Sequence, residues 1–122
     1  MSKILIIDDD PQVCELISVM LNFEKHAVEI AYNAADALKL YKSHHHDLII
    51  TDILMPGKDG IDTICELMEL NRDVPIIAMS GGRRALSSDF NLDSAKLVGA
   101  KVMLKKPFTD IQLRQAVKQA MA

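Results

Sequence analysis

The chain has 122 residues, of which 49% are apolar, and its formal net charge is −3. This length suits one domain with one core, and the apolar fraction predicts a packed interior rather than disorder. The mild negative charge and the scarcity of aromatic residues argue against a general nucleic-acid binder. We therefore expect a single domain over residues 1–122, with no output domain in this chain and no direct contact with nucleic acid.

The chain shows no sign of a membrane or secretory segment. No apolar run approaches the roughly 18 residues that can span a bilayer. The amino terminus leads straight into a strand-like segment, without the long apolar region of a signal peptide. The two cysteines, Cys14 and Cys65, lack CxxC spacing and lie in helical patterns. We predict unpaired thiols, a cytoplasmic location and no membrane partner.

Strand-like and helix-like segments alternate along the chain. Short apolar runs predict strands over residues 3–7, 27–31, 48–51, 76–79 and 102–104. Helical periodicity follows each of them, and the helices are expected from Pro11 to about Phe23, after Asn33, after Asp59, within residues 90–98, and from Thr109 or Asp110 onward. This alternation is typical of βαβ units and a mostly parallel sheet.

Five such units suit an α/β flavodoxin-like fold, a three-layer (βα)5 sandwich with strand order 2-1-3-4-5. Right-handed crossovers leave few other topologies. In this order the first and third strands lie side by side, and the second strand lies at an edge. The first and third helices cover opposite faces, so Cys14 and Cys65 could not form a disulfide.

Polar residues stand at the carboxyl ends of four predicted strands. Asp8 and Asp9 follow the first, Asp52 the third, Ser80 the fourth and Lys106 the fifth. These ends meet at one edge of a parallel sheet, where open α/β folds bind ligands. Gathered carboxylates repel one another unless a hard cation lies between them, and Mg²⁺ prefers such oxygen ligands.

This group of residues suits phosphoryl chemistry. An Asp carboxylate can attack phosphorus and hold the group as an acyl phosphate. A Lys can pair with a phosphoryl oxygen, and a Ser hydroxyl can donate a hydrogen bond only when the group is present. Taken singly, each residue is more often a turn former or a helix cap, which is the role predicted for Asp10 before Pro11. Because suitable polar residues stand at the ends of four predicted strands, we favour a role in phosphoryl chemistry over the structural roles.

Four motifs carry a resemblance to a known family: residues 4–10 (ILIIDDD), 52–60 (DILMPGKDG), 76–81 (IIAMSG) and 106–108 (KPF). Across essentially its full length the chain resembles the CheY-like receiver domain of two-component response regulators. The resemblance implies a phosphoacceptor of a two-component or phosphorelay system. It also implies a sensor histidine kinase or histidine phosphotransfer protein as phosphodonor, and a downstream protein target that the sequence does not name. Such a domain catalyses its own phosphorylation and slow dephosphorylation and is not a metabolic enzyme.

The family pattern also implies roles for individual residues. Asp52 is expected to be the phosphoacceptor, and Asp8 and Asp9 to form the acidic pocket for Mg²⁺, with Mn²⁺ as a substitute. Of these two, Asp9 is the expected direct ligand, and Asp8 is expected to act through water. Asp52 and the backbone carbonyl of Leu54 are expected to complete the protein's share of the coordination. The same pattern makes Ser80 the switch hydroxyl. It makes Lys106 the residue that binds the phosphoryl group, with a cis bond between Lys106 and Pro107.

The sequence departs from the family pattern in three places. Met103 stands where the family usually has Tyr or Phe, so the swing of an aromatic ring is not available. The connection over residues 81–91 is longer than expected, and we hypothesise that this loop and the helix after it rearrange on phosphorylation. Leu54 and Gly82 occupy positions thought to tune the access of attacking water, and an apolar Leu54 is expected to slow loss of the phosphoryl group.

Three other interpretations compete with the receiver. A phosphohydrolase with an Asp nucleophile generally needs a second acid two residues later, where this chain has Leu54. A flavin or nucleotide module would need a phosphate-binding loop after the first strand, and the acids at that position would repel phosphate without a metal. A degenerate receiver that only binds partners would not require the intact acids, Ser80 and Lys106.

The run His44-His45-His46 resembles a metal site, but we expect it to bind none. Adjacent residues do not share a helix face, and the sequence places no acid at ligand spacing beside them except Asp47.

Overall fold

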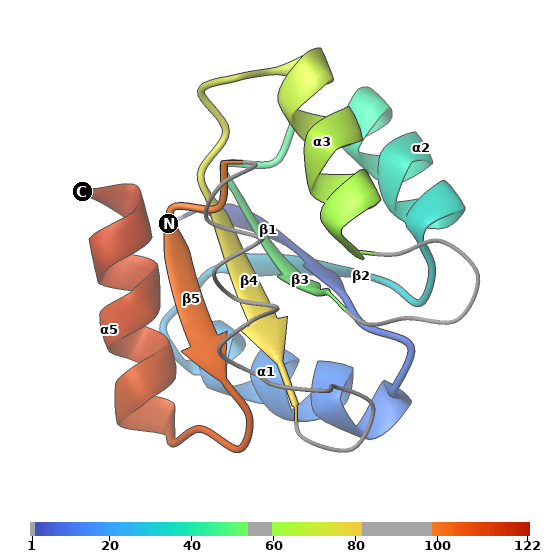
Figure 1. Ribbon diagram of the computed structural model, residues 1–122. Helices are drawn as coiled ribbons and strands as arrows, with labels where there is room; N and C mark the ends of the chain where they lie inside the picture. Colours follow the sequence, from blue (N-terminus) through green and yellow to red (C-terminus); the bar gives the residue numbers. More distant parts are fainter. Residues whose placement is uncertain (1, 54–59, 82–98) are drawn as a thin grey trace.

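The computed structural model describes residues 2–53, 60–81 and 99–122. Strands and helices alternate from residue 3 to residue 80, as the sequence predicts, and a fifth strand and a last helix follow within residues 99–122 (Figure 1). The elements are β1 (Lys3–Ile7), α1 (Pro11–Phe23), β2 (Ala27–Ala31), α2 (Ala34–His44), β3 (Leu48–Asp52), α3 (Gly60–Leu70), β4 (Ile76–Ser80), β5 (Val102–Lys105) and α5 (Asp110–Met121). The helix predicted within residues 90–98 and the cap predicted at Asp59 lie outside the described residues.

The five strands form one parallel sheet in the order β2-β1-β3-β4-β5, which confirms the predicted fold. Three strands extend one residue further than predicted, because their polar final residues still belong to the ladder. Asp52 pairs with Met79, and Ser80 pairs with Lys105. The polar residues at this edge are therefore held by the sheet itself.

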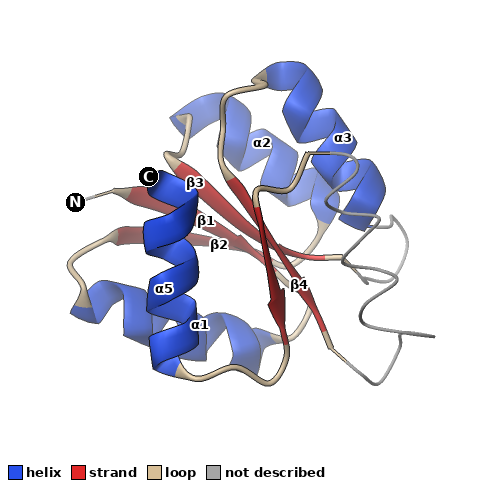
Figure 2. Ribbon diagram, turned by 60° about the vertical axis from the view of Figure 1, so that its left-hand side comes forward, coloured by secondary structure: helices blue, strands red, loops and turns tan. Residues whose placement is uncertain are grey.

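Two hydrophobic cores lie on opposite faces of the sheet (Figures 1 and 2). Helices α1 and α5 cover one face, where Cys14 and Leu113 pack in the same core as Ile6. Helices α2 and α3 cover the other face, where Ile64 packs in the same core as Leu5. Strands buried on both faces need apolar residues at successive positions, which explains the continuous apolar runs in the sequence.

Side-chain caps fix where three helices begin. Asp10 accepts a hydrogen bond from the Gln12 N–H at 2.9 Å, and Asn33 accepts one from the Asp36 N–H at 2.8 Å. Thr109 begins α5 with a reciprocal capping box. The predicted caps at Asn33 and Asp10 are confirmed, and Thr109 rather than Asp110 is the cap of the last helix.

Cys14 and Cys65 are free thiols, as the sequence predicts. Burial, together with the negative charge of Asp8, raises the pKa of Cys14 to about 12. At pH 8 only about one Cys14 in 10⁴ would be the reactive thiolate. We expect iodoacetamide at pH 8 to leave Cys14 unmodified in the folded protein and to modify both cysteines in urea, as read by peptide mass. Modification of Cys14 in the folded protein at the rate seen in urea would contradict this.

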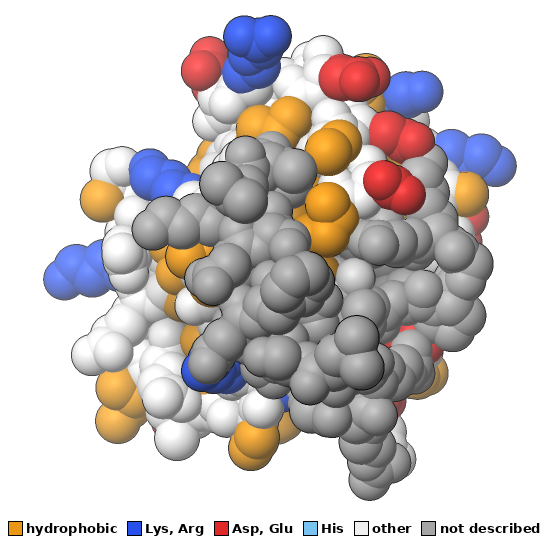
Figure 3. All heavy atoms as spheres, in the orientation of Figure 1, with side chains coloured by type: hydrophobic (Ala, Val, Ile, Leu, Met, Phe, Trp, Pro, Cys, Tyr) orange, Lys and Arg blue, Asp and Glu red, His pale blue; other side chains and the backbone are white. Residues whose placement is uncertain are grey.

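The face in Figure 3 shows described hydrophobic side chains in small groups, with acidic and basic side chains spread around its margin. Among the described helices, none has the length and apolar character needed to cross a membrane.

Candidate functional site

Three carboxylates meet at the carboxyl edge of the sheet. One oxygen from each of Asp8, Asp9 and Asp52 lies within 4.8 Å of the others. The β1–β3 register brings two of them together, because Ile7 pairs with Thr51 and these residues are followed by Asp8 and Asp52. Asp8 and Asp52 are buried, and Asp9 is half-buried. The predicted acidic pocket is therefore present as a cluster of side chains.

Lys106 reaches into this pocket from the residue after β5. Its Nζ lies 2.6 Å from Asp8 Oδ2 and 3.2 Å from Asp52 Oδ2. Its backbone N–H donates to the Ser80 carbonyl at 2.7 Å, and the Lys106–Pro107 bond is cis, as expected. One ammonium group thus contacts the last residue of β3 and the first residue after β1.

The sequence did not reveal how Gly81 supports this lysine. A Cβ placed on Gly81 would lie 3.1 Å from Lys106 Cδ and 3.3 Å from its Cβ. A side chain there would press on the aliphatic part of Lys106 and shift its ammonium group. The signal that could have indicated this role is that Gly81 directly follows Ser80, the last residue of β4.

The charges in the pocket are not balanced by Lys106. Burial raises the pKa of Asp8, and the hydrogen bonds from Lys106 and the Asp10 N–H offset this only in part. The charge of Asp52 raises the pKa of Asp8 further. Burial opposes the charged form of Lys106, yet its bond to Asp8 and the charge of Asp52 raise its pKa overall. Within residues 2–53, 60–81 and 99–122, Lys106 contacts two of the three clustered carboxylates, and such a cluster of like charges favours uptake of a further cation.

Ser80 ends β4 at the same edge and is completely buried. Its Oγ has no hydrogen-bond partner among the described residues. Buried hydroxyls normally make hydrogen bonds, so the Ser80 hydroxyl has the capacity to donate a further one. The sheet thus places all five residues that the sequence singled out at strand ends on one edge, where the side chains of Asp8, Asp9, Asp52 and Lys106 lie together.

Comparison with known proteins identifies the family. The sequence profile of the response regulator receiver domain matches residues 4–118. The chain belongs to this family. It is 34% identical over 97% of its length to the "Transcriptional regulatory protein CpxR homolog" of Haemophilus influenzae, and 33% identical over 95% of its length to the "Regulatory protein VanR" of Enterococcus faecium.

Solved structures agree with this assignment. A response regulator receiver domain protein from Clostridium thermocellum is 27% identical, with a TM-score of 0.90 over 99% of this chain and 94% of that one. The chemotaxis protein CheY4 of Vibrio cholerae, at 24% identity and a TM-score of 0.86, has the same fold. The receiver domain described here spans about half the length of the curated relatives, 49% of the CpxR homolog and 48% of VanR.

The acidic pocket of this receiver domain fits Mg²⁺. Its donors are carboxylate oxygens, the hard ligands that Mg²⁺ prefers, and receiver domains generally bind this ion. Asp8, Asp9 and Asp52 would hold it. The further ligand predicted at the Leu54 carbonyl lies outside the described residues.

Of the three departures from the family pattern, Met103 is the one that lies fully within the described residues. Met103 pairs with Ala78 in the β4–β5 register, is half-buried and packs against the core under α2 and α3. The receiver domain therefore has a flexible thioether where its family usually has an aromatic ring. Gly82 and nearly all of the 81–91 connection lie outside the described residues, so the hypotheses on water access and loop rearrangement stay predictions.

Proposed function

We propose that this receiver domain accepts a phosphoryl group on Asp52 from a phosphohistidine of a sensor histidine kinase or a histidine phosphotransfer protein. The observation that carries the proposal is the placement of the Asp52 carboxylate. It ends β3, lies beside Asp8 and Asp9, and contacts the Lys106 ammonium. Family membership supports the same assignment, since these domains act in two-component signalling rather than in metabolism.

In the proposed transfer, an Asp52 carboxylate oxygen attacks phosphorus. The bond between phosphorus and the donor imidazole nitrogen breaks, and its electron pair stays on that nitrogen. Because the reacting phosphohistidine carries a proton on its other ring nitrogen, the ring leaves as a neutral imidazole. Lys106 binds a phosphoryl oxygen as a point charge, and its ammonium has three N–H donors for the two carboxylates and the phosphoryl group. Bound Mg²⁺ would supply further positive charge to the phosphoryl oxygens. Attack by water on the acyl phosphate later releases phosphate and restores the carboxylate.

Ser80 is the proposed switch residue. Its buried Oγ has no hydrogen-bond partner in the part of the chain that the structure describes. It can donate to a phosphoryl oxygen on Asp52, a bond that exists only in the phosphorylated state. Forming this bond would move the end of β4 and the chain that follows it, and so change the surface offered to a downstream protein target. The cytoplasmic location stays a prediction from the sequence.

We expect Ser80→Ala to raise the free energy of unfolding of the unphosphorylated protein by about 1 kcal/mol, because it removes an unpaired buried hydroxyl. Urea titration measures this. Thr51→Val is the matched control, because the buried Thr51 hydroxyl donates to the Asp52 carbonyl at 3.0 Å. The control is expected to lose about 1 kcal/mol. Equal losses in both variants would show that the Ser80 hydroxyl is paired.

A small acyl phosphate tests the proposed function directly. The protein is incubated with acetyl phosphate and Mg²⁺, and its intact mass is measured. We expect one added phosphoryl group, which hydroxylamine removes because it cleaves acyl phosphates, and none when Mg²⁺ is chelated. A stable phosphoryl group that resists hydroxylamine, or no incorporation over a range of donor concentrations, would refute the proposal.

A further inference from the structure

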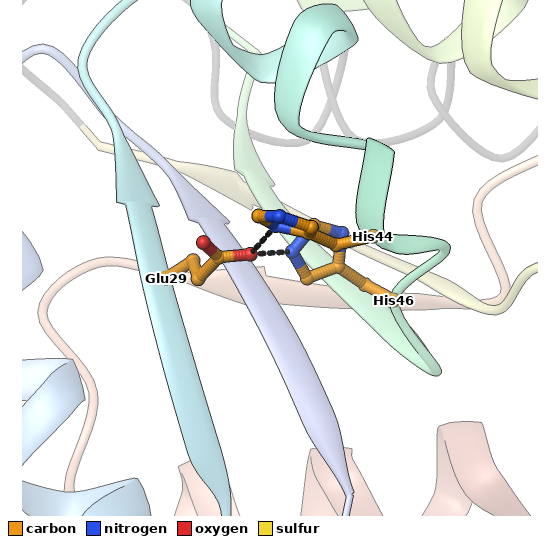
Figure 4. Close-up of side chains that lie close together, drawn as sticks. All are labelled: Glu29, His44 and His46. Atoms are coloured by element: carbon orange, nitrogen blue, oxygen red, sulfur yellow. Dashed lines mark hydrogen bonds and ion pairs between the residues drawn. The ribbon is translucent and has the colours of Figure 1, made fainter. Parts of the chain in front are cut away.

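A second cluster of ligand atoms lies away from the acidic pocket. Glu29 comes from the middle of β2, His44 is the last residue of α2, and His46 lies in the connection to β3. His44 Nδ1 and His46 Nε2 each lie 2.6 Å from the same oxygen, Glu29 Oε1. Figure 4 shows both rings directed at this carboxylate. The three ligand atoms all lie within 4.8 Å of one another.

The end of α2 explains how two residues of the histidine run meet at one point. The helix ends at His44. The next residue, His45, is its C-cap, and its φ of 48° lies in the left-handed region. His44 therefore projects from the last turn of the helix, while His46 belongs to the chain that leads into β3. The acid that the sequence did not place beside the histidines is Glu29, which β2 supplies from 15 and 17 positions earlier.

The cluster combines one anchored ligand with two accessible ones. The His46 side chain is 0% exposed and stacks on Tyr41, with ring centroids 6.1 Å apart and an interplanar angle of 22°. Tyr41 is itself held, because its hydroxyl accepts a hydrogen bond from Asn71 Nδ2 at 3.1 Å. The side chains of His44 and Glu29 are 42% and 33% exposed, so an ion can reach the cluster from solvent.

The protonation states suit a metal ligand set. Burial lowers the pKa of His46 even though Glu29 opposes the shift, which favours the neutral imidazole. Burial of Glu29 acts against its ionised form, but hydrogen bonds from both histidines lower its pKa overall. His46 Nδ1 has no hydrogen-bond partner among the described residues. In the metal-free cluster the His46 Nε2–H donates to Glu29, so binding of an ion at Nε2 would require the ring proton to move to Nδ1.

We propose that Glu29, His44 and His46 form a Zn²⁺ site. Two imidazoles and one carboxylate are a known three-residue zinc ligand set, with a fourth position open to water. Imidazole ligands favour zinc over the oxygen-preferring Mg²⁺ of the acidic pocket. Tetrahedral bonds of about 2.0–2.1 Å put ligand atoms about 3.3 Å apart, so each 2.6 Å contact has to open by about 0.7 Å. The exposed side chains of His44 and Glu29 can make that movement.

Zinc at this site would join the edge strand β2 to the end of α2 and the start of β3. The site is separate from the proposed phosphoacceptor, because His46 lies two residues before β3 and Asp52 ends that strand. Because Zn²⁺ would bind the folded chain and not the unfolded one, it would stabilise the folded state. At a free Zn²⁺ concentration of 100 times Kd, the ratio of folded to unfolded protein would rise about a hundredfold.

Histidine-ring NMR during titration with ZnCl₂, at millimolar Mg²⁺, locates the site. The chain has four histidines, which gives an internal control. We expect the ring signals of His44 and His46 to shift until one equivalent has bound, while those of His26 stay in place. Zinc uptake without shifts of His44 and His46, or no uptake at all, would overturn the proposal.

Calorimetric titration of three variants tests the ligand set. His44→Ala and Glu29→Gln change partly exposed side chains, and each is expected to weaken Zn²⁺ binding by more than tenfold. His45→Asn is the matched control, because Asn tolerates the left-handed backbone there, and its affinity is expected to be unchanged. Circular dichroism verifies that each variant folds. Equal affinity in all three variants would overturn the proposal, and so would a loss confined to His45→Asn.

Discussion

Asp52→Asn is expected to abolish incorporation of a phosphoryl group from acetyl phosphate and Mg²⁺. The amide is nearly the same size as the carboxylate but lacks the anionic oxygen that attacks phosphorus. It also removes one of the three carboxylates gathered at the pocket. Intact mass spectrometry measures the incorporation, and we expect it to fall below detection while the fold, followed by circular dichroism, is kept.

Asp47→Asn is the matched control, because Asp47 is exposed and lies at the opposite end of β3. Its carboxylate accepts a hydrogen bond from the Lys3 N–H at 2.9 Å and has no place in the pocket. We expect this variant to incorporate one phosphoryl group like the wild type. Full incorporation by Asp52→Asn would refute the assignment of the phosphoacceptor.

Lys106→Met is expected to slow phosphoryl transfer by about 10²–10³-fold, the usual cost of losing one charged group that stabilises a transition state. The same change is expected to tighten Mg²⁺ binding, because the ammonium now lies 2.6 Å from Asp8 and competes for its charge. Timed mass spectrometry gives the rate, and calorimetry gives the affinity. A faster reaction or weaker Mg²⁺ binding would contradict this role for Lys106.

The stability of Lys106→Met is expected to depend on pH in a defined direction. The pKa of Asp8 is already raised by burial, and loss of Lys106 raises it further. A carboxyl group with a raised pKa supports folding while it is protonated, and that support is lost as the pH rises above 3.8 through the folded-state value. Without Mg²⁺ the variant is expected to lose stability across this range more steeply than the wild type.

Lys105→Met serves as the control for both measurements, since Lys105 is the exposed last residue of β5 and directly precedes Lys106. We expect its transfer rate and its stability against pH to follow the wild type. A change of similar size in both variants would mean that the end of β5, rather than the ammonium in the pocket, sets the reaction.

The local sequence determined the elements and the edge on which the site lies. Continuous apolar residues predicted strands buried on both faces, and Asn33 and Asp10 predicted two helix starts, because these signals depend only on neighbouring residues. Parallel strands share one carboxyl edge, so the placement of Asp8 beside Asp52 followed from their positions after β1 and at the end of β3. The count of five βα units favoured the strand order, and the residue roles came from the family motifs.

Only the tertiary structure decided which side chains touch. Lys106 contacts Asp8, which is 98 positions away in the sequence, and Asp52, which is 54 positions away. Sequence periodicity gives no information on contacts between residues so far apart along the chain. Glu29 meets the histidines for the same reason, because the packing of α2 on the sheet brings the end of that helix to β2. Sequence patterns record which face of an element is buried, whereas contacts between elements depend on register and packing, which the whole fold sets.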